Sequence, residues 1–296
     1  MKNKTPIRTL ETASGTIRFP AYVPVTTFGS KYPLDGLIQP YLPRLAQAVM
    51  VSHYYAKQMK KRPRLPLMVD SGGFAALFEG SRILEQDGLG ILEVNLGDEP
   101  ELLTPWDVLD FQEEHADIAF TLDFPIPPGL GKAEAKLRQK TTIANALWAL
   151  ENRQRSNMRL YACIQGWDVA SFGRCAKAYR DRGFDGAAIG GMVPRVKDRK
   201  LVLACIASVR KQLPELPLHV FGLGHPSFLN QLYAAGVDSV DSSSYVKAAA
   251  DGKSWVPGAV KALVEPAPVE RLMIALGNLS VVTRMARRPL IAQKSS

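Results

Sequence analysis

Short apolar segments recur along this chain, and longer amphipathic segments separate most of them. Eight of the apolar segments read as strands: residues 21–25, 48–53, 67–70, 116–123, 159–165, 186–190, 218–223 and 237–241. Apolar positions recur at helical spacing in residues 133–155, 169–182, 199–212 and 226–235. Strands that alternate with helices indicate a parallel sheet with helices outside it, and eight such units close into a barrel. The sequence therefore predicts the α/β class and a (β/α)8 TIM barrel.

Two segments depart from this repeat. Residues 78–113 form a long insertion after the third strand, interrupted by several glycines, and a loop of this length is typical of a lid or a small subdomain. The chain after residue 250 begins with a Pro/Gly break and continues as an amphipathic stretch over residues 269–288. We predict a catalytic barrel domain at residues 1–250 and a short helical C-terminal extension at residues 251–296.

The composition narrows the classes of partner. The formal net charge of the 296 residues is +9, which favours a polyanion such as nucleic acid, although a plainly basic protein is the alternative. The three cysteines are far apart and form no cluster with histidine, so the sequence predicts no metal site and fits a cytoplasmic location. Apolar runs stay well below the roughly 20 residues that a membrane helix needs, so we expect no membrane partner.

Polar residues stand where the predicted strands end. Asp70, Asp123 and Asp241 end three of the strands, Gln165 ends a fourth, and Gly190-Gly191 follows a fifth. A barrel builds its active site at the carboxyl ends of its strands, so these groups should converge on one rim. A single aspartate at a strand end is often only a helix cap. Three on one rim indicate a function, because converging like charges are costly.

This set of side chains suits a purine ring. An aspartate accepts hydrogen bonds from ring N–H groups, and a glutamine both donates and accepts. Phe74 and Phe221 could stack on the faces of the base, or could equally belong to the core. A second carboxylate could attack a sugar carbon, as in glycosidases, and a third could move the proton. Such a reaction uses no cofactor.

The motifs resemble those of a known family. Residues 70–74, Asp-Ser-Gly-Gly-Phe, resemble the signature of the tRNA-guanine transglycosylase superfamily. Further segments resemble the family's other motifs in the same order along the chain: residues 117–123, 164–166, 183–191, 221–224 and 236–241. The resemblance implies a (β/α)8 enzyme that replaces guanine in a nucleic acid by a free 7-deazaguanine base.

The resemblance also implies roles for the residues. Asp241 would attack C1′ and form a covalent glycosyl–enzyme, and Asp70 would act as the general acid and base. The residues that would bind the base are Asp123, Gln165, Gly190 and Gly191, with Phe74 and Phe221 on its two faces. The target nucleotide must leave the stack to reach such a pocket.

The chain departs from the family pattern at some points. Ala75 stands where the family commonly has glutamine, and the family's zinc ligands, three cysteines and a histidine, are absent. We therefore expect a short member without zinc, with DNA slightly preferred as the target. The alternatives are the same exchange on tRNA, as in queuosine- or archaeosine-type modification, and a non-catalytic nucleic-acid-binding subunit.

Basic residues near the predicted rim are candidates for phosphate contacts. Lys247 and Lys253 follow the eighth strand, and Arg195 follows the sixth. A basic run at residues 57–64 precedes the third strand and is expected near the opposite end of the barrel. The expected partners are thus a polynucleotide and a free base, and a homodimer or an accessory subunit stays open.

Overall fold

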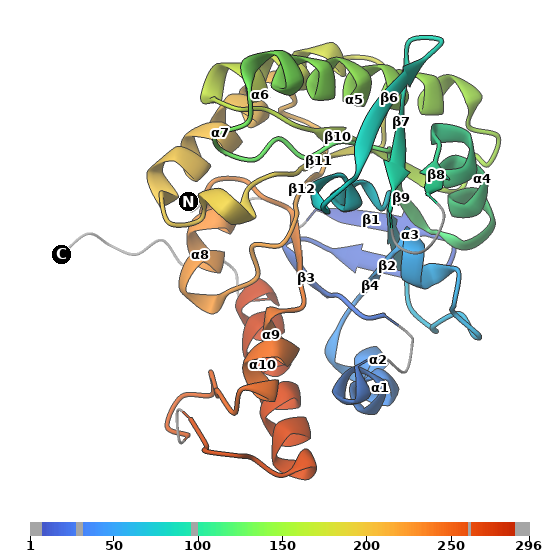
Figure 1. Ribbon diagram of the computed structural model, residues 1–296. Helices are drawn as coiled ribbons and strands as arrows, with labels where there is room; N and C mark the ends of the chain where they lie inside the picture. The colour runs from blue at the N-terminus through green and yellow to red at the C-terminus, as the bar shows by residue number, and fades with distance from the viewer. Residues whose placement is uncertain (1–7, 28–31, 96–99, 260–261, 288–296) are drawn as a thin grey trace.

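Eight parallel strands form the centre of the molecule. The structure, a computed structural model, describes residues 8–27, 32–95, 100–259 and 262–287 (Figure 1). The strands follow one another in the sheet as β3 (Ala21–Pro24), β13 (Ser239–Ser242), β12 (Leu218–Val220), β11 (Gly186–Ile189), β10 (Arg159–Ile164), β9 (Ile118–Phe120), β5 (Leu67–Asp70) and β4 (Val49–Ser52). The two ends of this series meet through a parallel bridge between Val25 and Met50, where Thr26 N donates to Met50 O at 2.9 Å. The predicted (β/α)8 barrel is confirmed.

Helices cover the outside of the barrel. The longer ones are α4 (Pro105–His115), α5 (Lys132–Asn152), α6 (Val169–Ala178), α7 (Arg199–Gln212), α8 (Pro226–Ala234) and α10 (Pro268–Arg287). The shorter ones are α1 (Pro33–Ile38), α2 (Leu42–Leu45), α3 (His53–Ala56) and α9 (Ser244–Ala250). Local sequence sets several helix starts: Thr104, Asp168 and Asp198 each accept a hydrogen bond from the backbone N–H three residues ahead.

Strand alternation divides the core into two layers, because successive side chains of a strand point to opposite faces. In β10, Leu160, Ala162 and Ile164 pack outward against the helices. Tyr161 and Cys163 point into the barrel, in the same cluster as Phe120. A short hairpin of β1 (Thr9–Thr12) and β2 (Gly15–Arg18) adds Ile17 to this inner cluster.

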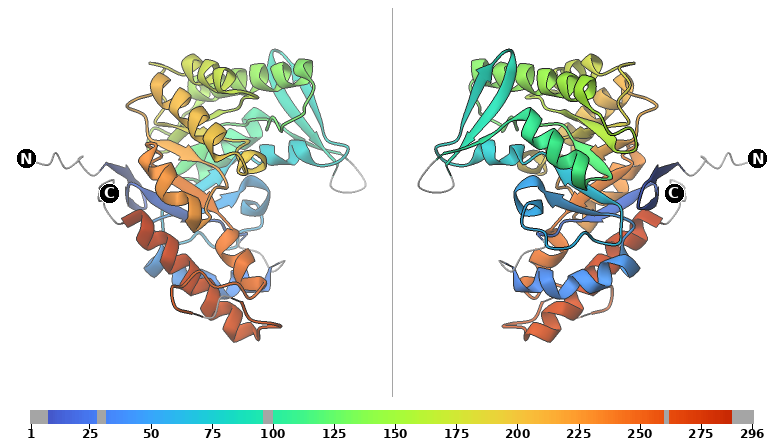
Figure 2. Two further views of the ribbon diagram at one scale, coloured as in Figure 1. Left: turned by 90° about the vertical axis from the view of Figure 1, so that its left-hand side faces the viewer. Right: turned by 90° about the vertical axis from the view of Figure 1, so that its right-hand side faces the viewer.

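The insertion after β5 is a small antiparallel sheet. A short 3-10 helix, η2 (Gly73–Leu77), leads into β6 (Arg82–Gln86), β7 (Leu89–Val94) and β8 (Glu101–Leu103), and residues 96–99 lie outside the described part. Figure 2 shows the β6–β7 hairpin projecting from the barrel. The insertion ends earlier than the predicted residue 113. Thr104 caps α4 there, and α4 packs on β5 and β9 as a barrel helix.

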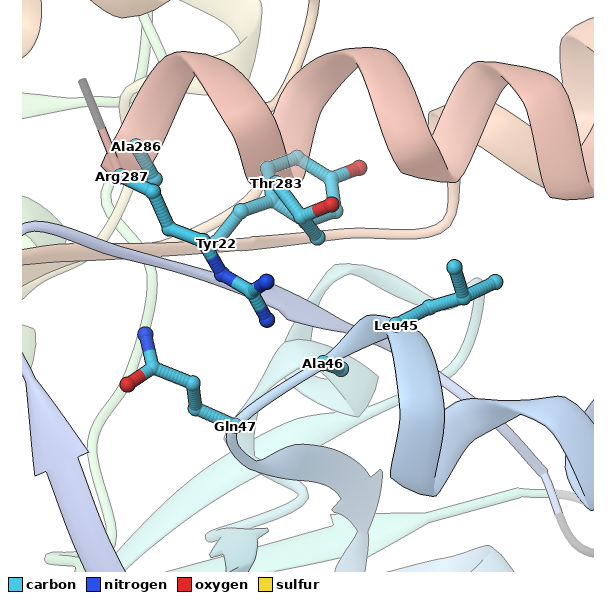
Figure 3. A pocket seen from close by; sticks show the side chains of 7 residues that line it. All are labelled: Tyr22, Leu45, Ala46, Gln47, Thr283, Ala286 and Arg287. Atoms are coloured by element: carbon cyan, nitrogen blue, oxygen red, sulfur yellow. The ribbon is translucent and has the colours of Figure 1, made fainter.

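The long helix α10 packs on the barrel wall. It contacts β3, α1, α8 and α9, and its apolar residues belong to the core between strands and helices. Figure 3 shows its Thr283 and Arg287 near Tyr22 of β3, opposite Gln47. A domain boundary at residue 250 stays a prediction, and residues 260–261 and 288–296 of the predicted extension lie outside the described part. No helix in the described part is long and apolar enough to cross a membrane.

Three buried or nearly buried aspartates fix the starts of the strands. Asp117, Asp185 and Asp238 precede β9, β11 and β13, and each accepts a hydrogen bond from the first or second N–H of a neighbouring strand, at 2.8–3.0 Å. Each also pairs with arginine: Arg62 with the first, Arg153 and Arg159 with the second, and Arg8 and Arg210 with the third. The Arg62–Asp117 pair places part of the basic run at this end of the barrel, away from the carboxyl ends of the strands.

Candidate active site

Three aspartates gather at the opposite end of the barrel. Asp70 is the last residue of β5, Asp241 lies in β13, and Asp123 follows β9. The charges of Asp241 and Asp123 both raise the pKa of Asp70, so both carboxylates lie near enough to act on Asp70 across the rim. None of these three pairs with lysine or arginine within the described residues. Hydrogen bonds alone therefore hold them.

Asp70 is the carboxyl group most suited to carrying a proton. Burial raises its pKa from the usual 3.8 to about 7, and the neighbouring carboxylates add to that rise. Two backbone donors oppose the rise: Gly72 N and His53 N reach its Oδ1 at 2.8 and 3.3 Å. Gly72 turns the chain at this point with a φ of 76°, which glycine adopts without strain. The outcome is a carboxyl group that exchanges a proton near neutral pH.

Asp123 and Gln165 form one hydrogen-bonded unit. Gln165 Nε2 donates to Asp123 Oδ2 at 2.6 Å, and Ser71 Oγ donates to Asp123 Oδ1 at 3.0 Å. Burial raises the pKa of Asp123, and these two donors lower it. Ile126 N donates to Gln165 Oε1 at 3.4 Å, which orients the amide. The pair presents a fixed set of acceptors and donors at the carboxyl ends of β9 and β10.

Glycines allow the backbone to approach this unit closely. A Cβ atom at Gly190 would lie 2.1 Å from Gln165 Nε2, and one at Gly73 would lie 1.9 Å from Asp123 O. Gly191 has a φ of 70°, and its Cβ would lie 2.9 Å from Gln165 Oε1. No larger residue fits at Gly73 or Gly190 without moving the Asp123–Gln165 pair. The predicted grouping of Asp123, Gln165 and the two glycines is thus present in space.

Asp241 has a side-chain partner that the sequence did not predict. Gly222 N donates to its Oδ1 at 3.0 Å, and His219 Nε2 lies 3.0 Å from the same oxygen. His219 Nδ1 lies 2.8 Å from Ser239 Oγ. The only indication of this contact in the sequence was the position of His219 within its strand. Alternation along the strands puts residues 219, 239 and 241 on the inward face. The pairing of His219 with Ser239 becomes evident only when β12 and β13 are aligned.

The two predicted aromatic residues have different surroundings. Phe74 on η2 is 64% exposed and meets Phe78 edge to face, with ring centroids 6.0 Å apart. Phe221 is partly buried inside the barrel, 4.9 Å from Phe120 and 4.9 Å from His219. Phe74 is thus free to contact a ligand, and Phe221 lies beside the partner of Asp241. The sandwich of a base between them stays a prediction.

The three predicted phosphate contacts differ in accessibility. Lys247 on α9 and Lys253 are exposed, and Lys253 pairs with Asp251 at 3.1 Å. Arg195 is only 5% exposed. Its guanidinium donates to Gly191 O at 2.5 Å and to Gly166 O at 3.3 Å, and burial lowers its pKa. Arg195 therefore links the loops that follow β10 and β11, because two of its N–H groups donate to backbone carbonyls there.

The residues do not suit a zinc site of the Cys/His type. Cys163, Cys175 and Cys205 are buried free thiols, and the chain after β13 contains neither cysteine nor histidine. Within the described ranges, no three acidic, histidine or cysteine side chains converge on one point as metal ligands would.

The raised pKa of Asp70 predicts a dependence of stability on pH. The folded protein binds this proton more tightly than the unfolded chain, so the contribution of Asp70 to the free energy of unfolding should fall as the pH rises from about 4 to about 7. The free energy of unfolding of the wild type minus that of Asp70→Asn should therefore decrease over this range, because Asp123 and His53, whose pKa values are also shifted, are present in both proteins. Carboxyl ¹³C NMR of Asp70 should show a midpoint near pH 7. A midpoint near 4, with the same pH dependence of unfolding in both proteins, would contradict the assignment.

Comparison with known proteins agrees with the motifs. The chain is 28% identical over 249 residues to the tRNA-guanine(15) transglycosylase of Methanothermobacter thermautotrophicus, covering 82% of this chain and 36% of the relative. It is 28% identical over 269 residues to the tRNA-guanine(15) transglycosylase of Pyrococcus furiosus, covering 86% and 43%. It is 30% identical over 180 residues to the queuine tRNA-ribosyltransferase of Helicobacter pylori, covering 59% and 48%.

The chain therefore spans less than half of the length of these relatives. The family model described as queuine tRNA-ribosyltransferase matches residues 5–263, which include every strand of the barrel and every carboxylate of the rim. The match over most of the chain, together with the rim of aspartates and glycines, shows that this protein belongs to the queuine tRNA-ribosyltransferase (tRNA-guanine transglycosylase) family.

Proposed function

We propose that this protein exchanges guanine in a tRNA for a free 7-deazaguanine base through a covalent intermediate on Asp241. The observation that carries the proposal is the difference between Asp70 and Asp241 on one rim. The pKa of Asp70 is raised to about 7, which suits a proton carrier. Asp241 Oδ1 has two hydrogen-bond partners, which would hold the carboxylate in place for attack.

The first half of the reaction would break the bond to guanine. A carboxylate oxygen of Asp241 attacks C1′ of the flipped nucleotide, and the C1′–N9 bond breaks with its electron pair leaving on guanine. Protonated Asp70 gives its proton to the departing base. This is the two-carboxylate division of labour of a retaining glycosidase, in which one group attacks and the other handles protons.

The second half would reverse the roles. Asp70, now ionised, removes the N9 proton of the incoming base, whose nitrogen then attacks C1′ and releases Asp241 as a carboxylate. Both bases present the same hydrogen-bonding edge, which the Asp123–Gln165 pair and the adjacent backbone at Gly190 would recognise. Exposed Phe74 would cover one face of the base.

The choice of tRNA rests on the relatives. The names of all those described above refer to tRNA, so the comparisons support tRNA as the target and lend no support to the preference for DNA that the sequence suggested. The net charge of +9 fits either polymer.

Base incorporation tests the proposal. The protein is incubated with a ¹⁴C-labelled 7-deazaguanine, or with labelled guanine, together with either tRNA or duplex DNA. We expect label in tRNA only, and we expect Asp241→Asn to incorporate none because an amide is a far weaker nucleophile. Label in DNA alone would contradict the choice of polymer. Binding of tRNA without incorporation of either base would favour a non-catalytic subunit.

The proposed phosphate contact of Lys247 has a separate test. Lys247→Ala should weaken tRNA binding and reduce the slope of log K against log salt by about 1, since one phosphate contact is lost. The matched control is Lys211→Ala, an exposed lysine in the last turn of α7, at the opposite end of the barrel. Equal slopes for the two variants, measured by filter binding over a salt series, would remove Lys247 from the contact surface.

A further inference from the structure

The interior of the barrel contains a histidine to which the reaction steps proposed above assign no role. His219 is fully buried, and its ring lies 5.2 Å from Phe120 and 4.9 Å from Phe221. A polar ring among aromatic side chains is costly unless its nitrogens are hydrogen-bonded. Both are: Nε2 lies 3.0 Å from Asp241 Oδ1, and Nδ1 lies 2.8 Å from Ser239 Oγ.

The strand register holds these three groups in a row. His219 of β12 is paired directly with Ser239 of β13, and Asp241 lies two residues further along β13. Residues two apart in a strand share a face, so the serine, the imidazole and the carboxylate all point into the barrel. Neither rotation of the strands nor a loop movement is needed to assemble the row.

The protonation of each group determines which atom donates and which accepts in these two hydrogen bonds. An ionised carboxylate only accepts hydrogen bonds, so Nε2 must carry the proton that it shares with Asp241. In a neutral imidazole Nδ1 is then an acceptor, and the Ser239 hydroxyl donates to it. Ser239 thereby selects the tautomer that places an N–H donor on the carboxylate.

We infer that His219 is a positioning residue for Asp241, held in its working tautomer by Ser239. His219 and Gly222 N both occupy Oδ1, and within the described residues no hydrogen bond to Oδ2 is seen. Oδ2 is therefore the oxygen presented to C1′. The inference rests on the proposed function, because it assigns the attacking oxygen of that reaction.

The same contact would act in the second half of the reaction. When the incoming base displaces Asp241, the C1′–O bond breaks and its electron pair returns to the carboxylate. The Nε2–H donor stabilises this returning charge without any reorganisation of the barrel interior, as preorganised donors do at other reaction centres. The intermediate should consequently persist longer when the donor is lost.

Kinetics of three variants test this inference. His219→Phe removes both hydrogen bonds and should lower kcat by about 100-fold with a change in KM for tRNA of less than about 2-fold. His219→Gln keeps a side-chain N–H donor, and its kcat should be about tenfold higher than that of His219→Phe. The matched control is Tyr161→Phe, which deletes a buried hydroxyl that has no hydrogen-bond partner among the described residues. Tyr161 contacts the same Phe120, and the variant should stay within about 2-fold of wild type.

Histidine ¹⁵N NMR supplies a measurement that does not depend on turnover. We expect the His219 signals to show a protonated Nε2, and Ser239→Ala to increase the population of the other tautomer. An unprotonated Nε2 would overturn the inference, as would equal kcat values for His219→Phe and Tyr161→Phe. A wild-type protein that modifies neither tRNA nor DNA would instead count against the proposed function, while the NMR result would still decide the contact.

Discussion

The structure depends on how each buried carboxylate is compensated, by an arginine partner or by hydrogen bonds alone. At the amino ends of the strands, Asp117, Asp185 and Asp238 each bind a strand N–H and each pair with arginine. Such paired charges are satisfied, and they fix the register from which the barrel is built. Removal of Arg62 would leave the buried charge of Asp117 without its arginine partner.

At the carboxyl ends of the strands the same residue type has no arginine or lysine partner within the described ranges. Asp70, Asp123 and Asp241 are held by backbone N–H groups and by neutral side chains. Burial without a counter-ion raises the pKa of Asp70 to about 7, and also raises that of Asp123. The carboxylates at one end of the barrel thus form ion pairs that stabilise its wall, and those at the other end are the ones to which the proposed function assigns the chemistry.

The sequence predicted the frame of the molecule well. Strand 67–70 begins and ends as predicted, and the other seven strands lie within or beside the predicted ranges. Parallel barrel strands are almost wholly apolar and end at polar or glycine residues, so their pattern is legible without a structure. The family signature at residues 70–74 then located the rim.

What the sequence did not predict depends on contacts between distant segments. Arg195 follows β11 and was expected at phosphate, but the carbonyls of Gly166 and Gly191 hold it inside. The sequence did not distinguish His219 from the other three histidines. The alignment of β12 with β13 brings its Nε2 to Asp241. The insertion was predicted too long, because Thr104 starts a barrel helix within it. Glycine content gave no indication of that start.

The measurement that tests the central claim most directly is the location of the covalent intermediate. The protein is denatured during reaction with a tRNA, digested, and the peptide that carries the ribosyl group is identified by mass spectrometry. The division of roles described here predicts attachment at Asp241 alone. Attachment at Asp70 or Asp123, or turnover of the base without any covalent peptide, would contradict it.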